Sequence, residues 1–392
     1  MKIGIMTFWM SSDNYGQQLQ CYALQKYLRN AGHDAYLIRY NIYNDYAPKS
    51  PRPVWKKFLK LFNPNKLYRY LSDKKQMTTI AQENKKNEKR EFEGFRSKYI
   101  KQSERIYNRY DELKENPPEA DVYIVGSDQV WNPNYYLSLE KQVGAYFLGF
   151  GDSSIKRISY APSFCNEKLN DEIVKIIAPL LKKFDYVSVR EKQGLNICKQ
   201  CGINNAEYVP DPTILLDANT YRALYKNEVL RKTGKQYCFL YFLNNGSDFH
   251  VKNVYDWAKR KNIEVVYVSA NFQVDKYKKT YATIPEWIYL LEHSEYVITN
   301  SYHCCVFALL FEKKFSVIPI SQKHKEMNSR VDSLFELFQI EKRWVNSDFS
   351  ILNNEINWRQ IREKFQDLRD SSNLVDVIET ATFNKRKNSL EI

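Results

Sequence analysis

Short apolar runs alternate with amphipathic segments along most of this chain, and the alternation predicts an α/β protein. An apolar run at 2–8 predicts the first strand, helical spacing of apolar residues follows at 19–28, and 35–39 predicts the next strand. Further strands are predicted at 121–125, 157–161, 186–190, 237–243, 264–269, 296–299 and 315–319, with helical patterns between them. Strict alternation over two halves predicts two doubly wound, Rossmann-like domains that face each other across a cleft.

The predicted domain limits follow from breaks in this pattern. The breaker-rich stretch Pro210-Asp-Pro-Thr213 and the apolar residues after it are interpreted as the end of a first domain at 1–216. A second domain is predicted at 217–345, and the polar tail at 346–392 is predicted to be helical and able to return across the cleft. Between 41 and 120 the sequence is basic, rich in tyrosine and interrupted by prolines, which predicts an insertion of two or three helices in the first domain.

The stretch around His303 is the strongest candidate for chemistry. Tyr296 to Thr299 predicts a buried strand, Asn300-Ser-Tyr302 is a polar break, and an apolar helix is predicted to begin at or just after His303. In open α/β sheets, ligands bind at the carboxyl ends of strands, and a helix start offers free N–H groups to an anion. An imidazole there suits general acid/base work. A histidine that only helps to start the helix is the alternative.

Other polar residues follow predicted strands in the same way. The first loop, 11–18, contains Gly16, which allows a ligand to approach the backbone closely. Gly126-Ser-Asp-Gln-Val-Trp-Asn-Pro133 follows a buried strand, and the strand at 186–190 ends in Arg190 beside Glu191. A surface ion pair is the alternative for Arg190 and Glu191. The chain has no GxGxxG motif, so a dinucleotide cofactor is not predicted.

Composition narrows the class of protein. The chain has 392 residues, of which 43% are hydrophobic, enough for a large core and more than one domain. No apolar run approaches the roughly 20 residues of a membrane span, and residues 1–10 lack the features of a signal peptide, so we expect a cytoplasmic protein. The seven cysteines include a single Cys198-Lys-Gln-Cys201, and we expect reduced thiols and no metal site.

The formal charge of +13 suggests an anionic partner, and residues 41–120 supply much of it, with 19 Lys and Arg against 11 Asp and Glu. Nucleic acid, anionic lipid and a phosphorylated substrate are the candidates, and a solvated charged face is the alternative. No nucleic-acid-binding motif is present, so nucleic acid is not predicted. Residues 54–62 place Trp55, Phe58 and Phe62 on one face, which is typical of a helix lying on anionic membrane and equally of a helix packed on its own domain.

Four stretches resemble, in the same order, the polysaccharide pyruvyl transferase family. They are Asn14-Tyr-Gly-Gln-Gln-Leu-Gln20, Val125-Gly-Ser-Asp-Gln-Val-Trp-Asn-Pro133, Val187-Ser-Val-Arg-Glu191 with Asp211-Pro-Thr213, and Ile298-Thr-Asn-Ser-Tyr-His303. The resemblance covers nearly the whole chain apart from the insertion and the tail. It implies a fold like the B-type glycosyltransferases. It also implies transfer of pyruvate from phosphoenolpyruvate to a sugar of a surface polysaccharide or lipid-linked oligosaccharide, as a cyclic ketal, without a metal or a further cofactor.

The resemblance also implies roles for single residues. His303 is similar to the family's essential histidine, Arg190 to its donor-binding arginine and Lys323 to its phosphate-contacting lysine. Many members carry Gly-x-Arg where this chain has Asn300-Ser301-Tyr302, and Arg330 is the candidate substitute for the missing arginine. The residues grouped with the donor are Arg190, Lys323, Arg330, Asn300 and Ser301, and those grouped with the acceptor are Asn14, Gly16, Gln20, Ser127 and Trp131.

The chemistry of phosphoenolpyruvate fits these residue types. A guanidinium can bind its carboxylate or phosphate through two bonds, and a lysine supplies a point charge. His303 is the predicted acid or base, and Asp128 is either its complementary group or the cap of a turn. Trp131 is either a stacking platform for a sugar or a lid over the core. A sugar-nucleotide glycosyltransferase and a non-catalytic glycan- or phosphate-binding module remain the alternative functions.

Overall fold

The computed structural model describes residues 1–42, 85–135, 139–228, 230, 234–243, 251–270, 275–320 and 328–380. The amphipathic segment at 54–62 and Lys323 lie outside these ranges, so the membrane contact and the phosphate-contacting lysine stay predictions. Within the described ranges, no helix has the length and apolar character needed to cross a membrane.

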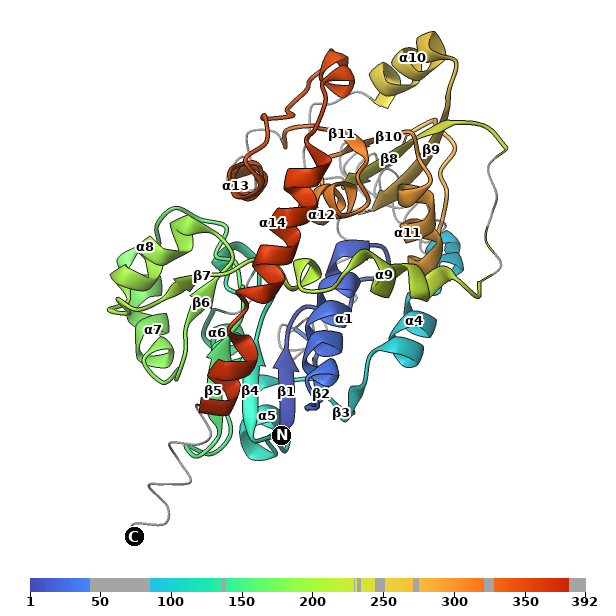
Figure 1. Cartoon of the computed structure of the whole chain (residues 1–392). Coiled ribbons are helices and arrows are strands. Elements are labelled where there is room, and N and C mark those ends of the chain that lie inside the picture. The colour runs from blue at the N-terminus through green and yellow to red at the C-terminus, as the bar shows by residue number, and fades with distance from the viewer. Residues whose placement is uncertain are drawn as a thin grey trace, which may run out of the picture.

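The first sheet has five parallel strands in the order β3-β2-β1-β4-β5 (Figure 1). The strands are β1 (Lys2–Met6), β2 (Asp34–Tyr40), β3 (Gln102–Tyr107), β4 (Val122–Val125) and β5 (Lys156–Ser159). The helices that accompany it are α1 (Tyr15–Asn30), α4 (Phe92–Tyr99), α5 (Tyr110–Glu115), α6 (Leu139–Tyr146) and α7 (Asp171–Leu181). The direction in which strands are added reverses between β1 and β4, so the loops after these two strands flank the position where doubly wound sheets bind ligands.

The second sheet has four parallel strands in the order β11-β10-β8-β9. They are β8 (Tyr237–Leu243), β9 (Glu264–Ala270), β10 (Tyr296–Thr299) and β11 (Lys314–Val317), with helices α10 (Val251–Lys261), α11 (Ile284–Glu292), α12 (Tyr302–Leu310) and α13 (Ser329–Phe338). Its reversal lies between β8 and β10, and His303 follows β10 directly. The predicted α/β class with two Rossmann-like parallel sheets is confirmed.

A short segment connects the two sheets and carries polar residues of the site. Strands β6 (Ser188–Val189) and β7 (Glu207–Tyr208) form a separate parallel pair, and α8 (Lys192–Gln200) lies between them in sequence. The strand predicted at 186–190 is therefore shorter than expected. A 3-10 turn, η4 (Pro212–Ile214), then leads into α9 (Ala218–Tyr225).

The described part of the predicted insertion at 41–120 contains two helices, α4 and α5, but it is wrong to treat this part as an insertion outside the sheet. Residues 102–107 form β3, the edge strand of the first sheet, paired in parallel with β2. The sequence Gln-Ser-Glu-Arg-Ile-Tyr conceals this strand because only Tyr107 is buried, and an edge strand at the surface needs no apolar alternation. Phe92 and Phe95 of α4 are buried in the core, so this part is integral to the domain.

One hydrophobic cluster extends from the first domain to the second sheet. Tyr15, Leu19 and Tyr22 of α1 belong to the same buried cluster as Tyr237, Phe239 and Tyr241 of β8. Helix α1 begins at Tyr15, earlier than predicted, because its first turns carry glutamines whose burial the polar sequence does not reveal. The first helix of the first domain therefore packs against the second sheet.

The end of the described chain returns to the first domain. Helix α14 (Trp358–Asp370) contacts α12, α13 and η4, and it runs from the second sheet towards the first (Figure 1). Leu374 and Ile378, beyond α14, are fully buried in a cluster with Ile3 and Ile5 of β1. The segment after α14 thus completes the core beneath the first sheet.

Candidate active site

His303 lies on the first turn of α12, with its polar neighbours fixing the turn. The side chain of Ser301 caps the helix by accepting from the Cys304 N–H at 3.4 Å. The amide of Asn300 donates to the Leu243 carbonyl and accepts from the Leu243 N–H, each at 2.7 Å, which ties β10 to the end of β8. The sequence therefore places a largely buried imidazole at the carboxyl end of a central strand.

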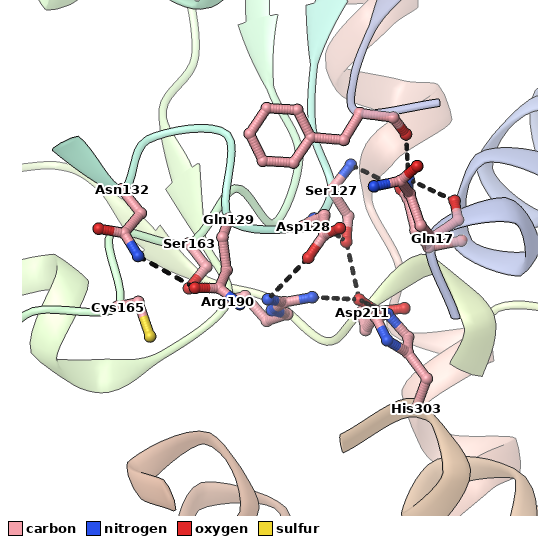
Figure 2. Close-up of polar contacts among 12 residues, drawn as sticks. Gln17, Ser127, Asp128, Gln129, Asn132, Ser163, Cys165, Arg190, Asp211 and His303 are labelled. Atoms are coloured by element: carbon pink, nitrogen blue, oxygen red, sulfur yellow. Dashed lines mark hydrogen bonds and ion pairs between the residues drawn. The ribbon is translucent and has the colours of Figure 1, made fainter. Parts of the chain in front are cut away.

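Asp211 is one of the residues whose polar contacts Figure 2 draws, and it is the centre of the site. Its carboxylate is fully buried. One oxygen, Oδ1, accepts from the Thr213 N–H at 3.0 Å and from its hydroxyl at 2.7 Å. The other, Oδ2, accepts from Ser127 Oγ at 2.7 Å and Arg190 Nη1 at 2.8 Å, and it lies 3.4 Å from His303 Nε2. This carboxylate joins residues of the first domain to the histidine of the second.

The electrostatic surroundings keep Asp211 ionised. Burial by itself raises the pKa of this carboxyl, but His303, Arg190 and the hydrogen bond from Ser127 outweigh it and hold the pKa well below its ordinary value. A buried carboxylate with these partners can hold the orientation of a neighbouring imidazole.

Arg190 follows β6 and is only 3% exposed. Besides its bond to Asp211, its Nη2 lies 3.8 Å from Asp128 Oδ1, and the guanidinium sits 5.1 Å from the centre of the Tyr302 ring. Burial opposes the charge, but Asp211, Asp128 and Glu191 raise the pKa of Arg190 above its ordinary value. Its Nε and Nη2 atoms have no hydrogen-bond partner among the described residues. A buried guanidinium with unused donors favours an anionic ligand.

Asp128 and Glu191 complete the polar surroundings of Arg190. Asp128 has a left-handed backbone, with φ of 73°, and its carboxylate faces Arg190, so the structure does not favour a turn cap. Glu191 is buried and accepts from Ser163 Oγ at 2.6 Å and the Cys165 N–H at 3.0 Å. The surface ion pair considered for Arg190 and Glu191 is therefore wrong.

Gly16 brings the first turn of α1 against the imidazole. Asn14 caps this helix by accepting from the Gln17 N–H at 3.2 Å. A Cβ atom built at Gly16 would lie 2.4 Å from His303 Nδ1, closer than any real contact of that kind. A glycine is required at this position because the backbone of α1 and the histidine ring are in direct contact.

We expect Gly16→Ala to destabilise the protein by about 1–3 kcal/mol, the usual cost of overpacking a buried site. The added methyl group must displace either the His303 ring or α1. Urea unfolding measures the loss. Gly94→Ala in α4 is the matched control: its Cβ would find only the Glu91 Cβ, at 3.9 Å, so helix propensity should raise the stability by up to about 1 kcal/mol. Equal changes in the free energy of unfolding for Gly16→Ala and Gly94→Ala would contradict the contact between Gly16 and the His303 ring.

Four of the predicted ligand residues are buried and already bonded within the protein. Trp131 is 1% exposed, lies 4.8 Å from Phe147 in a stacked pair and donates its indole N–H to the Tyr146 carbonyl, so no face is open to a sugar. Ser127 and Gln20 are fully buried and bonded to each other, Ser127 N–H to Gln20 Oε1 at 3.1 Å. Both polar side-chain atoms of Asn300 are hydrogen-bonded to the backbone of Leu243. Ser127, Gln20 and Asn300 support the site from beneath, and Trp131 packs the core.

Other predicted residues lie near the site without a demonstrated ligand role. Arg330 is largely buried on α13. Burial raises the pKa of Tyr302, while the charges of Arg190 and Arg330 oppose that rise. Asn14, Ser301 and Arg330 stay predictions. Within the described ranges, no group of three or more His, Cys, Asp or Glu side chains is placed to hold a metal ion.

The sequence alone did not single out Asp211. It forms part of the Asp-Pro-Thr motif, and an acidic residue before proline and threonine predicts the cap of a helical turn, which Oδ1 provides. Nothing in the local pattern indicates that Oδ2 faces an arginine and a histidine far away in sequence. The residues around this carboxylate, which are Ser127, Arg190, Thr213 and His303, form with it the Asp211 hub. The hub forms only in the tertiary structure.

Comparison with known proteins gives the family. Similar solved structures include a UDP-GlcNAc 2-epimerase from Methanocaldococcus jannaschii, with 12% identity, a TM-score of 0.44 and coverage of 95% of this chain and 94% of that one. Arabidopsis thaliana UGT89C1 complexed with quercetin has 9% identity, a TM-score of 0.47 and coverage of 97% and 99%. Such low scores support no functional conclusion. No curated protein matches the sequence.

The family model for polysaccharide pyruvyl transferase matches residues 14–322, a span that includes every residue of the Asp211 hub. The chain therefore belongs to the polysaccharide pyruvyl transferase family.

Proposed function

We propose that this protein transfers the pyruvyl group of phosphoenolpyruvate to two hydroxyls of a saccharide, forming a cyclic ketal and releasing phosphate. The observation that carries the proposal is the buried Arg190 guanidinium directly beside the His303–Asp211 pair, because its Nε and Nη2 have no hydrogen-bond partner among the described residues. A small ligand with two or three negative charges can accept hydrogen bonds from Nε and Nη2 of Arg190. The His303 imidazole is then within reach of the same ligand. Family membership supports a saccharide as the acceptor.

The donor requires binding for two anionic groups, a carboxylate and a phosphate. Arg190 offers the unused edge of its guanidinium to one of them. Arg330, whose charge opposes the rise of the Tyr302 pKa, supplies a second positive charge, and Lys323 is the proposed phosphate contact. The N-terminus of α12 adds the positive end of its helix dipole next to His303. This set of charges favours phosphoenolpyruvate over a neutral ligand.

The reaction transfers protons at the methylene carbon of the donor and at the two hydroxyl oxygens of the acceptor. The methylene carbon gains a proton, which leaves positive charge at the neighbouring enol carbon, and a sugar hydroxyl forms a C–O bond there and loses its proton. The bond from that carbon to the phosphate oxygen then breaks, with the electron pair leaving on phosphate. A second hydroxyl closes the ketal, and its proton departs with the phosphate. His303 exchanges protons with the reacting atoms, a role worth about 10²- to 10⁴-fold in rate. Asp211 is a positioning residue that holds the imidazole.

A direct test is to incubate the protein with phosphoenolpyruvate labelled with ¹³C at the enol carbon and a panel of oligosaccharide and lipid-linked acceptors. We expect phosphate release that depends on acceptor, in equal amount to a new ketal carbon signal. Arg190→Lys should abolish donor binding. Arg157→Lys is the matched control, because Arg157 is a buried arginine whose side chain bonds only to backbone carbonyls, including those of Leu148 and Phe150.

Other results would overturn the proposal in defined ways. Consumption of a sugar nucleotide with no use of phosphoenolpyruvate would identify a glycosyltransferase. Tight binding of a glycan or of phosphate, with no turnover of either donor on any acceptor, would identify a binding module.

A further inference from the structure

Arg90 is a buried arginine outside every motif discussed so far. It belongs to the 3-10 turn η2 (Glu88–Arg90), ahead of α4, and it is 2% exposed. Its Nε donates to Asn87 Oδ1 at 3.0 Å, Nη1 to the Tyr15 hydroxyl at 2.7 Å and Nη2 to the Ser269 carbonyl at 2.6 Å. One guanidinium thus bonds to its own turn, to α1 of the first domain and to β9 of the second sheet.

Tyr15 is held between the same two domains. Its hydroxyl accepts from Arg90 and donates to the Ala282 carbonyl, just ahead of α11, at 2.6 Å. Its ring stacks on Trp287 of α11 with centroids 5.4 Å apart and lies edge-on to Tyr241 of β8. Burial raises the pKa of Tyr15 to about 12, so the hydroxyl keeps its proton for Ala282 near neutral pH. The first residue of α1 is therefore anchored to the second domain.

This anchor is one residue away from the histidine contact. Gly16, next to Tyr15 on the first turn of α1, presses against the His303 ring, and Asp211 lies on its Nε2 side. A movement of the α1 first turn away from the second sheet would leave the Nδ1 side of the imidazole without support. The ring's position thus depends on where Tyr15 is held.

We propose that Arg90 is a positioning residue for the reaction: through Tyr15 and the backbone of Ser269 it holds the first turn of α1 against the second domain, and so keeps the imidazole of His303 beside Asp211. The inference rests on the proposed function for its kinetic consequence, but the position of the ring can be measured without any turnover.

The bonding pattern explains why this position holds an arginine. A buried charge costs free energy, and an apolar side chain of similar length commonly fills such a space at least as well. Arg90 instead uses its three nitrogens on three separate segments, and its guanidinium also lies 5.0 Å from the centre of the Tyr281 ring. A lysine has a single nitrogen and cannot span the same three acceptors in one plane.

The experiment compares Arg90→Met and Tyr15→Phe with Arg343→Met as the matched control. Arg343 is also a buried arginine that bonds to backbone carbonyls, those of Phe315 and Ile351, but it lies away from α1. The five histidines of the chain are labelled with ¹⁵N and the His303 imidazole signals are assigned with His303→Gln. We expect Arg90→Met and Tyr15→Phe to shift the His303 signals and Arg343→Met to leave them unchanged, although all three lower thermal stability.

Kinetics and rescue provide the second readout. We expect Arg90→Met to lower kcat about tenfold to hundredfold with a small change in KM for phosphoenolpyruvate, since a misplaced catalytic group loses rate. Guanidinium ions at millimolar concentration should restore part of the rate in Arg90→Ala, which leaves space for the ion, and none in Arg343→Ala. His303 signals that match wild type in both folded Arg90→Met and Tyr15→Phe would overturn the proposal. If Arg90→Met does not fold, Tyr15→Phe decides by the same signals. A shift of His303 without any pyruvyl transfer by wild type would uphold the positioning role and reject the proposed function.

Discussion

Asp211→Asn should lower the rate of pyruvyl transfer about 10²- to 10³-fold and reduce the free energy of unfolding by about 3–5 kcal/mol. The buried carboxylate is shared by Arg190 at 2.8 Å, Ser127 at 2.7 Å and His303 at 3.4 Å. An asparagine keeps the shape but removes the charge, which leaves the buried Arg190 with the less favourable carboxylates of Asp128 and Glu191 as its counterions among the described residues. Initial-rate assays measure the loss of transfer rate, and urea unfolding measures the loss of free energy of unfolding.

Asp217→Asn is the matched control for Asp211→Asn. Asp217 is also an aspartate that caps a helical turn, accepting from the Thr220 N–H at 2.7 Å, but it is exposed and belongs to α9. We expect less than about 1 kcal/mol of destabilisation and wild-type activity, since asparagine also caps well. Similar losses in both variants would show that Asp211 acts only as a cap.

The same carboxylate makes stability depend on pH. The pKa of Asp211 is lower in the folded than in the unfolded protein, so its contribution is complete above the unfolded value of about 3.9 and is lost as pH falls below it. Between pH 5 and pH 3, wild type should therefore lose more free energy of unfolding than Asp211→Asn does.

His303→Gln should lower transfer about 10²- to 10⁴-fold while calorimetry finds the affinity for phosphoenolpyruvate within about threefold of wild type. The donor's anionic groups are expected to contact Arg190, Arg330 and Lys323, which the substitution leaves in place, whereas glutamine cannot exchange a proton with the reacting atoms. A loss of affinity that equals the loss of rate would indicate a binding role instead.

His293→Gln is the control for the histidine. His293 is exposed at the end of α11, where its ring bonds to the Tyr289 carbonyl and packs on Tyr289 and Tyr225. Rate and affinity should both stay at wild-type values. Turnover in His303→Gln within about tenfold of wild type would remove His303 from the proton transfers.

Strand and helix positions were predictable wherever burial follows the sequence pattern. The strands at 237–243 and 296–299 were predicted with the ends they have, because both faces of a central parallel strand are apolar. The start of α1 and the strand β3 were missed for opposite reasons. Gln18 and Gln20 are polar but fully buried, and Ser103, Glu104 and Arg105 are polar residues of an edge strand at the surface.

The site was predictable in part for the same physical reason. Residues at the carboxyl ends of parallel strands converge, so Asp128, Arg190 and His303 could be named from their positions after strands. Asp211 and Arg90 could not be identified as site residues, because each acts through contacts with segments distant in sequence. Trp131 could be predicted only as either a sugar platform or a lid over the core, because a tryptophan in a polar stretch gives no sign of whether its face is covered.

The contribution of Leu374 and Ile378 to the core under β1 has a consequence for biosynthesis. A ribosome completes the first sheet's strands by residue 159, yet the residues that seal the far side of that sheet are added only near residue 378. At roughly 5–20 residues per second, the nascent chain waits on the order of 10–40 s with Ile3 and Ile5 incompletely covered. Chaperones that bind apolar segments thus have a defined window on the nascent chain, and it closes only when the C-terminal segment leaves the exit tunnel.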